Sequence, residues 1–401
     1  MSLVRYRPVP SDRMAALWTF AQITDAVILD CGPMGTVSFE KRKIGNMGVD
    51  TSNIYATHLT DHEIVMGDVA RIEAAISSAD SEKKPPLIIV IPSVILTTTG
   101  ADIRGVCNYM QDEINAQLLV YAVKGSDGDF TRGLKSSYSI LVEELCEISE
   151  TEAGTCNILG VSAASPSSKK DAAEVCSLLE KAYGLRTILR LGAPCGYEDF
   201  KKASSASINI VLMAEALDAA RYMEKEFGIP YVYKVPYGFR KTAEFIAEVG
   251  RVTGSEPDSG LMNEIQALSS RYENSQAGKA VAVMGDYDLT SGIMQFASEL
   301  GITDVCGICE HDLSWIDDPD PAVTHYDREK DWIGQISGLH GNLIIGDERV
   351  GYIAPKDNDL LIASNGELAP DKSYTGPFIG ISGANEIIMR LSSNAHIKEA
   401  L

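Results

Sequence analysis

Three places in this chain combine residue types that can bind a metal or a cofactor. Asp30 and Cys31 end a short apolar run, directly before the Gly-Pro pair at 32–33. Cys306 and Cys309 form a CxxC pair, and His311 follows two residues later. Cys195 follows a third apolar run. Thiolate, carboxylate and imidazole groups are the usual protein ligands of zinc and of iron–sulfur clusters. These residues are therefore the candidate ligands.

Each candidate also has a plain structural interpretation. A free cysteine is most often a small buried core residue, and that alternative holds for Cys31. The CxxC pair with His311 can chelate zinc or iron. A structural zinc site needs four ligands, however, and no second pair is evident, so the alternative is a buried strand end with an incidental thiol. The sequence leaves these alternatives open, and it does not show whether the four cysteines converge.

The candidates lie where apolar runs end, and the order of those runs predicts the fold. Apolar runs alternate with segments of helical periodicity, which is typical of parallel α/β layers. Thr60 and Glu63 predict a capped helix start, and glycines at 184 and 228 close two further predicted helices. The predicted strands are 26–29, 87–96, 117–125, 157–163, 186–194, 207–213, 229–238, 279–286, 303–309, 342–347 and 358–364. The main predicted helices are 134–148, 168–184, 214–228, 289–301 and 384–391.

Length and composition restrict the class of protein. A chain of 401 residues is long enough for two or three domains. Its formal net charge of −21 argues against nucleic-acid binding, which needs a basic face. No apolar run approaches a membrane span and the N-terminus lacks a signal-peptide core, so we expect a cytoplasmic protein with no membrane partner. The eight cysteines are too sparse for a disulfide scaffold. Neither glycine-rich phosphate-binding motif occurs, so no nucleotide site is expected in this chain.

Several stretches, in order along nearly the whole chain, resemble the component 1 family of nitrogenase. That family includes the molybdenum–iron protein subunits, their cofactor-assembly scaffolds and the dark-operative protochlorophyllide reductases. DCGPMGT (30–36) is similar to the family's H-G-P-x-G-C loop, and LTDHEIVMG (59–67) to its L-T-E-x-D-I-V-F-G segment. GADI (100–103) resembles G-D-D-I, SINIV (207–211) with FGIP (227–230) follows the family order, and the stretch 374–384 resembles the closing Y-x-P-x-x-G-Y-x-G-A motif.

This resemblance implies an architecture and a set of partners. The expected fold is α/β, with three doubly wound parallel-sheet (Rossmann-like) domains around a central cleft. We expect the domains at 1–152, with the cluster-site-like loop and the dimer interface, at 153–276 and at 277–401. The implied partners are a second component 1-type subunit, in a homodimer or a heteromer, and a separate ATP-hydrolysing iron protein as electron donor.

The chain departs from the family at the cluster ligands. Where the family has its three cluster cysteines, this chain has no cysteine in 11–15, Thr36 at the end of the loop, and Val94. Met213 aligns with the family's cofactor-anchoring cysteine. Threonine and valine supply no thiolate for an iron–sulfur cluster. Cys31 replaces the family's histidine. If the chain forms a pseudo-symmetric or homodimeric assembly, two copies of Cys31 could face each other across the interface and bridge part of a cluster, with Asp30 as an oxygen ligand.

Two functions from different classes follow. The first is a nitrogenase-like component 1 oxidoreductase that accepts electrons from the iron protein and reduces a substrate of unknown identity. In this hypothesis an iron–sulfur cluster is held with Cys31 and Asp30, and Cys195, Cys306, Cys309 and His311 lie at the cofactor or metal site. The alternative is a non-catalytic scaffold or carrier that binds a metallocofactor or a tetrapyrrole-like ligand. The missing ligands at 36 and 94 favour the alternative, and the segment 59–67 favours the oxidoreductase.

Overall fold

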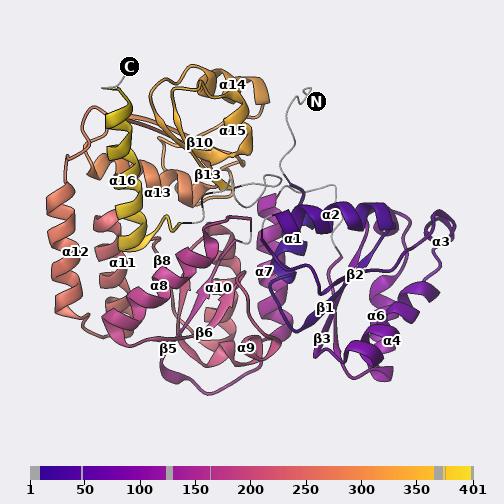
Figure 1. Cartoon of the computed structure of the whole chain (residues 1–401). Coiled ribbons are helices and arrows are strands. Elements are labelled where there is room, and N and C mark those ends of the chain that lie inside the picture. The colour runs from indigo at the N-terminus through magenta and orange to yellow at the C-terminus, as the bar shows by residue number, and fades with distance from the viewer. Residues whose placement is uncertain are drawn as a thin grey trace.

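The computed structural model describes residues 10–46, 48–122, 130–162, 164–364, 374 and 376–398. Its strands form three sheets in which every described pair is parallel. Helices cover the sheets, and Figure 1 shows the three units from indigo through magenta to orange. The predicted α/β class with three doubly wound units is confirmed. The exact domain boundaries at 152/153 and 276/277 stay predictions.

The first unit has a four-stranded sheet in the order β2-β1-β3-β4. Its strands are β1 (Ala26–Cys31), β2 (Ile54–Ala56), β3 (Leu87–Pro92) and β4 (Gln117–Val120). Its helices are α1 (Asp12–Phe20), α2 (Met34–Asn46), α3 (Asp61–Met66), α4 (Ala70–Lys83), α5 (Val94–Thr98), α6 (Ile103–Met110) and α7 (Phe130–Leu145).

The second unit repeats the same strand order, β6-β5-β7-β8. Its strands are β5 (Glu152–Leu159), β6 (Arg186–Leu191), β7 (Ala206–Val211) and β8 (Tyr231–Tyr233). Its helices are α8 (Ser168–Tyr183), α9 (Tyr197–Lys202), α10 (Leu217–Phe227), α11 (Gly238–Thr253) and α12 (Ser259–Tyr272).

The third unit has five strands in the order β11-β10-β9-β12-β13. Its strands are β9 (Ala280–Gly285), β10 (Asp304–Cys309), β11 (Thr324–His325), β12 (Leu343–Asp347) and β13 (Asp359–Ser364). Its helices are α13 (Tyr287–Glu299), α14 (Glu329–Ser337), α15 (Glu348–Ile353) and α16 (Gly380–Lys398).

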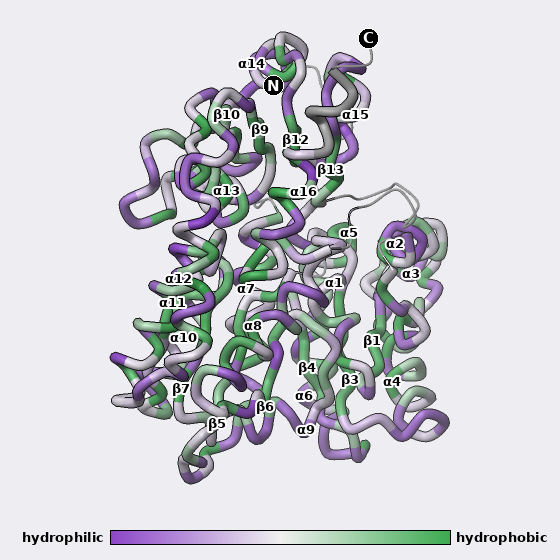
Figure 2. Tube along the Cα trace, turned by 60° about the vertical axis from the view of Figure 1, so that its left-hand side comes forward, coloured by the Kyte–Doolittle hydropathy of each residue, from purple (hydrophilic) through white to green (hydrophobic). Residues whose placement is uncertain are grey.

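Helix packing joins the three units into one body. α7 packs on α1 and on α10, so one hydrophobic cluster runs from the first unit into the second. α16 returns from the third unit and packs on α8 and α11 (Figure 1). The apolar strands lie inside, as the green strand segments in Figure 2 show, because parallel sheets are covered on both faces. Within the described residues, no helix is long and apolar enough to cross a membrane.

Local signals placed many elements and misplaced others. Thr60 and Glu63 form the predicted capping box at the start of α3, and Gly184 and Gly228 end α8 and α10 in the left-handed conformation. The predicted strand 87–96 is wrong beyond Pro92. Ser93 accepts a hydrogen bond from the Leu96 N–H and starts α5, so the side-chain cap overrides the apolar run. Part of the predicted strand 117–125 lies outside the described residues.

Candidate functional site

The three sheets each have a switch point, where neighbouring strands lead to connections on opposite sides. In open α/β sheets ligands bind at such points, beyond the carboxyl ends of the strands. In the first sheet the switch point lies between β1 and β3, at the loop that follows Cys31. In the second it lies between β5 and β7, and in the third between β9 and β12. These places are where the site has to be sought.

A buried ion triad occupies the switch point of the first sheet. Arg13, on α1, donates from Nη2 to Asp30 Oδ1 and from Nη1 to Glu40 Oε1, each at 2.5 Å. Its Nε donates to the carbonyl of Pro92 at the end of β3. Burial, opposed by Arg13 and assisted by Glu40, raises the pKa of Asp30 to about 7. The two carboxylates therefore share one guanidinium at this edge of the sheet.

Cys31 points into the core beneath this triad. Its side chain is fully buried in a hydrophobic cluster with Ile64, Val90 and Cys107, and its thiol donates weakly to the Leu29 carbonyl at 3.7 Å. Burial raises the pKa of the thiol far above its usual range, which favours the neutral thiol over the thiolate that binds metals.

The residues at this edge do not fit the cluster that the resemblance implies. The segment 11–15 supplies Arg13, which has no lone pair to give to iron, and the loop supplies a carboxylate already paired with that guanidinium. Position 94 carries valine, which has no ligand atom. The donor set is therefore that of an ion triad and not of a cluster.

The other predicted ligands lie in the loop after β6 and on or just after β10. The backbone of Cys195 joins the loop after β6 to the segment before β1, through bonds with Gln22 and Thr24, and burial raises the pKa of its thiol. Cys306 packs half-buried beside β9. Cys309 is buried at the end of β10, where burial raises its pKa. The ring of His311 stacks on Phe130, with centroids 5.9 Å apart.

The structure places Cys309 beside His311, whose backbone N–H donates to the Cys309 sulfur, but it gathers no larger group of these residues. Among the described residues, no three His, Cys, Asp or Glu side chains are grouped so that they could hold a metal ion. A cavity does lie between the second and third units, and none of Cys31, Cys195, Cys306 and Cys309 is among the described residues that line it.

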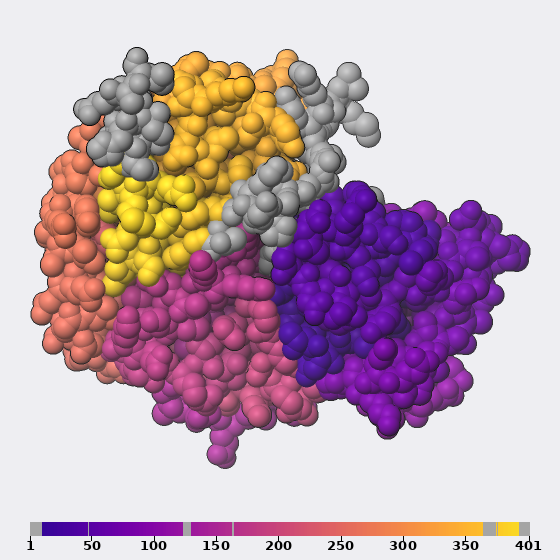
Figure 3. All heavy atoms as spheres, in the orientation of Figure 1, coloured from indigo at the N-terminus to yellow at the C-terminus, as the bar shows by residue number. Residues whose placement is uncertain are grey.

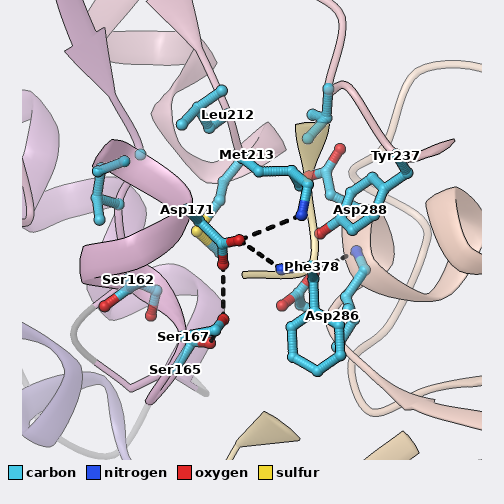
Figure 4. Close-up of a pocket in the computed structure, with 17 residues that line it drawn as sticks. Ser162, Ser165, Ser167, Asp171, Leu212, Met213, Tyr237, Asp286, Asp288 and Phe378 are labelled. Carbon is cyan, nitrogen blue, oxygen red and sulfur yellow. Dashed lines mark hydrogen bonds between the residues drawn. The ribbon is translucent and has the colours of Figure 1, made fainter. Parts of the chain in front are cut away.

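This central cavity lies at two switch points at once. The loops after β5, β7 and β9 line it, together with the start of α8 and the segment that leads into α16 (Figure 4). It contains about 500 Å³ of empty space when the open solvent at its mouth is included. Gly160 has φ +84°, and a Cβ there would lie 3.0 Å from the Met213 nitrogen, so glycine lets the two loops approach closely.

Three aspartates line the cavity, Asp171 from α8 and, far along the chain, Asp286 and Asp288 from the start of α13. Asp171 accepts from the N–H groups of Phe378 and Ile379, at 2.7 and 3.2 Å, and from the Ser167 hydroxyl at 2.6 Å. Asp288 accepts from the Ala214 N–H and the Tyr233 hydroxyl, each at 2.7 Å.

The third aspartate and a buried glutamate complete this acidic interior. Asp286 caps α13 by accepting from the Leu289 N–H at 2.8 Å. Glu215, beside Met213, is buried near Asp286 and Asp288. Burial raises the pKa of Asp171 to about 6 and that of Asp288 to about 7, and it also raises the pKa values of Asp286 and Glu215.

The other walls are apolar or hydroxylic. They include Tyr237, Val235, Leu212, Met213, Phe378 and four serines between 162 and 168. Among the described lining residues there is no lysine, arginine or histidine. In the outer surface shown in Figure 3, the yellow α16 lies between the magenta and orange units.

The sequence interpretation missed these aspartates, although one signal was present. Asp286 directly follows the apolar run of β9, in the same position that made Asp30 a candidate at the end of β1. Asp171 and Asp288 lie inside helices α8 and α13, where an acidic residue usually means an exposed face. Only the packing of the second unit against the third turns them inward.

Comparisons with known proteins agree with the fold and the motif order. The model of the family "Nitrogenase component 1 type Oxidoreductase" matches residues 11–394. The chain is 25% identical over 290 residues to the nitrogenase iron-molybdenum cofactor biosynthesis protein NifE of Clostridium pasteurianum, covering 68% of this chain and 62% of that protein. It is 30% identical over 247 residues to one of the subunits of the light-independent protochlorophyllide reductase of Rubrivivax gelatinosus, covering 57% and 45%.

A solved structure and the matched lengths complete the comparison. The structure described as "Nitrogenase Cp1 at pH 6.5" superposes with a TM-score of 0.79 at 18% identity, covering 99% of this chain and 95% of that one. That likeness shows a shared fold. The matches span between 34% and 72% of the length of the curated relatives, and 62%, 48% and 45% of the first three.

Proposed function

Since the chain belongs to the nitrogenase component 1 type oxidoreductase family, we propose that it is the ligand-holding subunit of a component 1-type complex. It binds a small molecule in the central cavity between its second and third units. It pairs with a second component 1-type subunit, either another copy of this chain or a different one. This is the scaffold or carrier function, and one of its relatives is named as a cofactor biosynthesis protein.

The central cavity is the observation that carries this proposal. It lies at the switch points of two sheets, where α/β proteins bind ligands. Its hydrogen-bonding groups are held in place: Asp171 is fixed by two backbone N–H groups and Asp288 by a third. Pre-positioned polar groups in a largely apolar pocket are the usual features of a ligand site.

An exposed apolar face on the first unit supports pairing with a second subunit. The apolar face consists of Met34, Phe39, Val65, Met66 and Ile95, whose exposed fractions run from 46% to 75%. These residues belong to α2, α3 and α5, which follow β1, β2 and β3 at one end of the first sheet (Figure 2). Large apolar side chains gathered on a surface mark protein–protein contacts.

Electron transfer is the second candidate function. Here the subunit accepts electrons from an ATP-hydrolysing iron protein, and the ligand in the cavity is reduced. Val65 and Met66, in the segment 59–67, favour it because they project from α3 as a protein-docking surface would. In this function a partner subunit supplies the cluster ligands that this chain lacks, and Cys31 adds a thiol only if it turns out of the hydrophobic cluster that buries it.

Anaerobic purification of the full-length chain from its producing cells tests the first function. Native mass spectrometry should give a complex with a second subunit and a small molecule that is released on denaturation. Val235→Phe, which fills one wall of the cavity, should abolish the small molecule and leave the complex intact. A chain that purifies alone and without any bound small molecule would contradict the proposal.

Iron and acid-labile sulfide analysis, with electron paramagnetic resonance, separates the two functions. Wild type, Cys31→Ala and the control Cys107→Ala are compared, since Cys107 is buried in the same hydrophobic cluster. Iron and sulfide lost only in Cys31→Ala would establish the electron-transfer function. Equal content in all three, or none in any, would leave the ligand-holding function alone.

A further inference from the structure

The hydroxyl of Tyr237 lacks a partner inside the central cavity. The residue is only 8% exposed, and among the described residues none forms a hydrogen bond with this hydroxyl. Figure 4 shows it directed into the cavity. The hydroxyl is therefore available to a molecule bound in the cavity, as a hydrogen-bond donor or acceptor.

Three carboxylates line the same cavity as this hydroxyl. Asp286, Asp171 and Asp288, in that order of effect, add to burial in raising the pKa of Tyr237 far above its usual range. The three come from the loop after β9, from α8 and from α13. Once these carboxyls are ionised, an anion in the cavity is repelled by them and a cation is attracted.

Lone pairs remain for a ligand that donates hydrogen bonds. Each carboxylate oxygen can accept two bonds. Asp288 accepts one hydrogen bond on each oxygen, from the Ala214 N–H and from the Tyr233 hydroxyl. Asp286 accepts one on Oδ1, from the Leu289 N–H. An ammonium group, with three N–H donors, matches such a set of acceptors.

A metal ion suits the cavity less well than an organic cation. Among the described residues, no three acidic, thiol or imidazole groups are placed so that they could hold a metal ion. The other walls, formed by Leu212, Met213 and Phe378, are apolar and fit a short hydrocarbon body. The aromatic rings of Tyr237 and Phe378 add cation–π attraction for an ammonium group beside them.

We propose that the central cavity binds a small organic cation, a primary ammonium compound with a short apolar body, among Asp171, Asp286, Asp288 and the hydroxyl of Tyr237. This inference rests on the proposed function, because it specifies the chemical class of the ligand that the subunit holds. It differs from an anionic metallocluster in charge, in ligand atoms and in size.

Other charged groups near these acids do not make the cavity positively charged. His311 faces Asp286 from the loop after β10, and Lys135 faces Glu215 from α7. Neither is among the described lining residues. Glu215 adds a fourth acid behind Asp288. Because a bound cation favours the ionised carboxylates, its affinity rises as the pH rises through the range in which they titrate.

Three probes of similar size test which ligand charge the cavity prefers. The full-length chain is titrated with butylammonium, butyrate and 1-butanol by calorimetry and by thermal shift at pH 8. Butylammonium should bind, and butyrate and butanol should bind at least about tenfold more weakly, a difference of one good charge-assisted hydrogen bond. The affinity for butylammonium should fall several-fold when the pH is lowered from 8 to 6.

Four variants locate the binding. Asp171→Asn and Asp288→Asn, which keep the shape and the backbone acceptor, should each weaken butylammonium about tenfold, and Tyr237→Phe should weaken it less. Glu180→Gln, on the exposed face of α8, should leave it unchanged. Butylammonium binding that survives both Asn variants would overturn the inference.

The result for butyrate separates this inference from the proposed function. Suppose that butyrate binds more tightly than butylammonium and that Val235→Phe abolishes butyrate binding. This result would overturn the inference that the ligand is a cation, and it would still show a cavity that holds a ligand. If none of the three probes binds, the inference of a cationic ligand is also overturned. The small molecule released from the natively purified chain then decides the proposed function independently.

Discussion

Arg13 and Asp30 form a buried ion pair across 2.5 Å, at the edge of the first sheet where the family resemblance implies an iron–sulfur cluster. Arg13 comes from the segment aligned with one lost cysteine, and Asp30 precedes the loop aligned with another. Glu40 on α2 pairs with the other terminal nitrogen of the guanidinium, Nη1. The edge is thus held together by charge and hydrogen bonds among this chain's own side chains.

Replacing Arg13 should strongly destabilise the protein. In Arg13→Met, two carboxylates remain buried without their cation, and breaking a buried ion pair in this way costs roughly 3–5 kcal/mol. Urea unfolding at pH 8 should show the loss. Arg71→Met is the matched control, since Arg71 pairs with Glu63 on the surface, and it should change little. Equal stability of Arg13→Met and wild type would show that the triad contributes nothing to folding.

Asp288→Asn should stabilise the protein in a pH-dependent way. Burial first, and Asp286 second, raise the folded-state pKa of Asp288 to about 7, above its usual value near 4 in an unfolded chain. Between these two pKa values Asp288 is ionised in the unfolded state but still protonated in the folded state. The free energy of unfolding of wild type therefore falls as the pH rises from about 4 to about 7. The asparagine of the variant does not titrate, so the variant does not lose stability in this way.

The measurement compares unfolding free energies across pH 4 to 8. The variant should gain roughly 1–4 kcal/mol over wild type above pH 7 and nothing near pH 4. The groups that face Asp288 are Asp286, Glu215 and Tyr233, and all three stay in place. A constant difference at every pH would mean that Asp288 is ionised in the folded state over the whole range.

Ser93→Ala should weaken the start of α5. The Ser93 hydroxyl accepts from the Leu96 N–H and caps this five-residue helix, which carries Ile95 of the apolar face. Loss of a serine cap costs about 1 kcal/mol. Thermal unfolding should show that loss, and Ser93→Thr should restore most of it. Unchanged stability of the alanine variant would show that the apolar packing of Leu96 alone holds the turn.

The same residue shows how far sequence reasoning reaches. Local rules placed what depends on neighbours in the chain, such as the Thr60–Glu63 capping box and the glycine ends at 184 and 228. They failed at Ser93, where one side-chain bond ends a long apolar run. They also gave no helix between 239 and 278, where α11 and α12 lie, although α11 has a buried face that includes Phe245.

The site depends on contacts that no local rule contains. Cys31 and Asp30 are adjacent in β1, and alternation alone cannot tell which one faces the core. The structure turns Cys31 into the hydrophobic cluster and Asp30 toward Arg13. The cavity joins Asp171 and Asp288, which are more than a hundred positions apart along the chain, and only the packing of two units reveals them.

Charges placed on the apolar face should prevent pairing without unfolding the subunit. Val65 and Met66 are 75% and 67% exposed, so Val65→Asp with Met66→Lys removes little buried area within the chain. If a second subunit covers this face, two desolvated charges at the contact should weaken association at least about tenfold. Size-exclusion chromatography with light scattering measures the assembly, and thermal unfolding checks the fold.

A matched control separates this face from general surface effects. Ile148→Lys changes a 90% exposed residue between α7 and β5, away from the apolar face, and should leave the assembly intact. If the double variant assembles as wild type does, the partner must bind elsewhere and α3 is free for another protein. If it dissociates and still binds a small molecule, pairing and ligand binding are independent, because the cavity lies in the second and third units and the apolar face in the first.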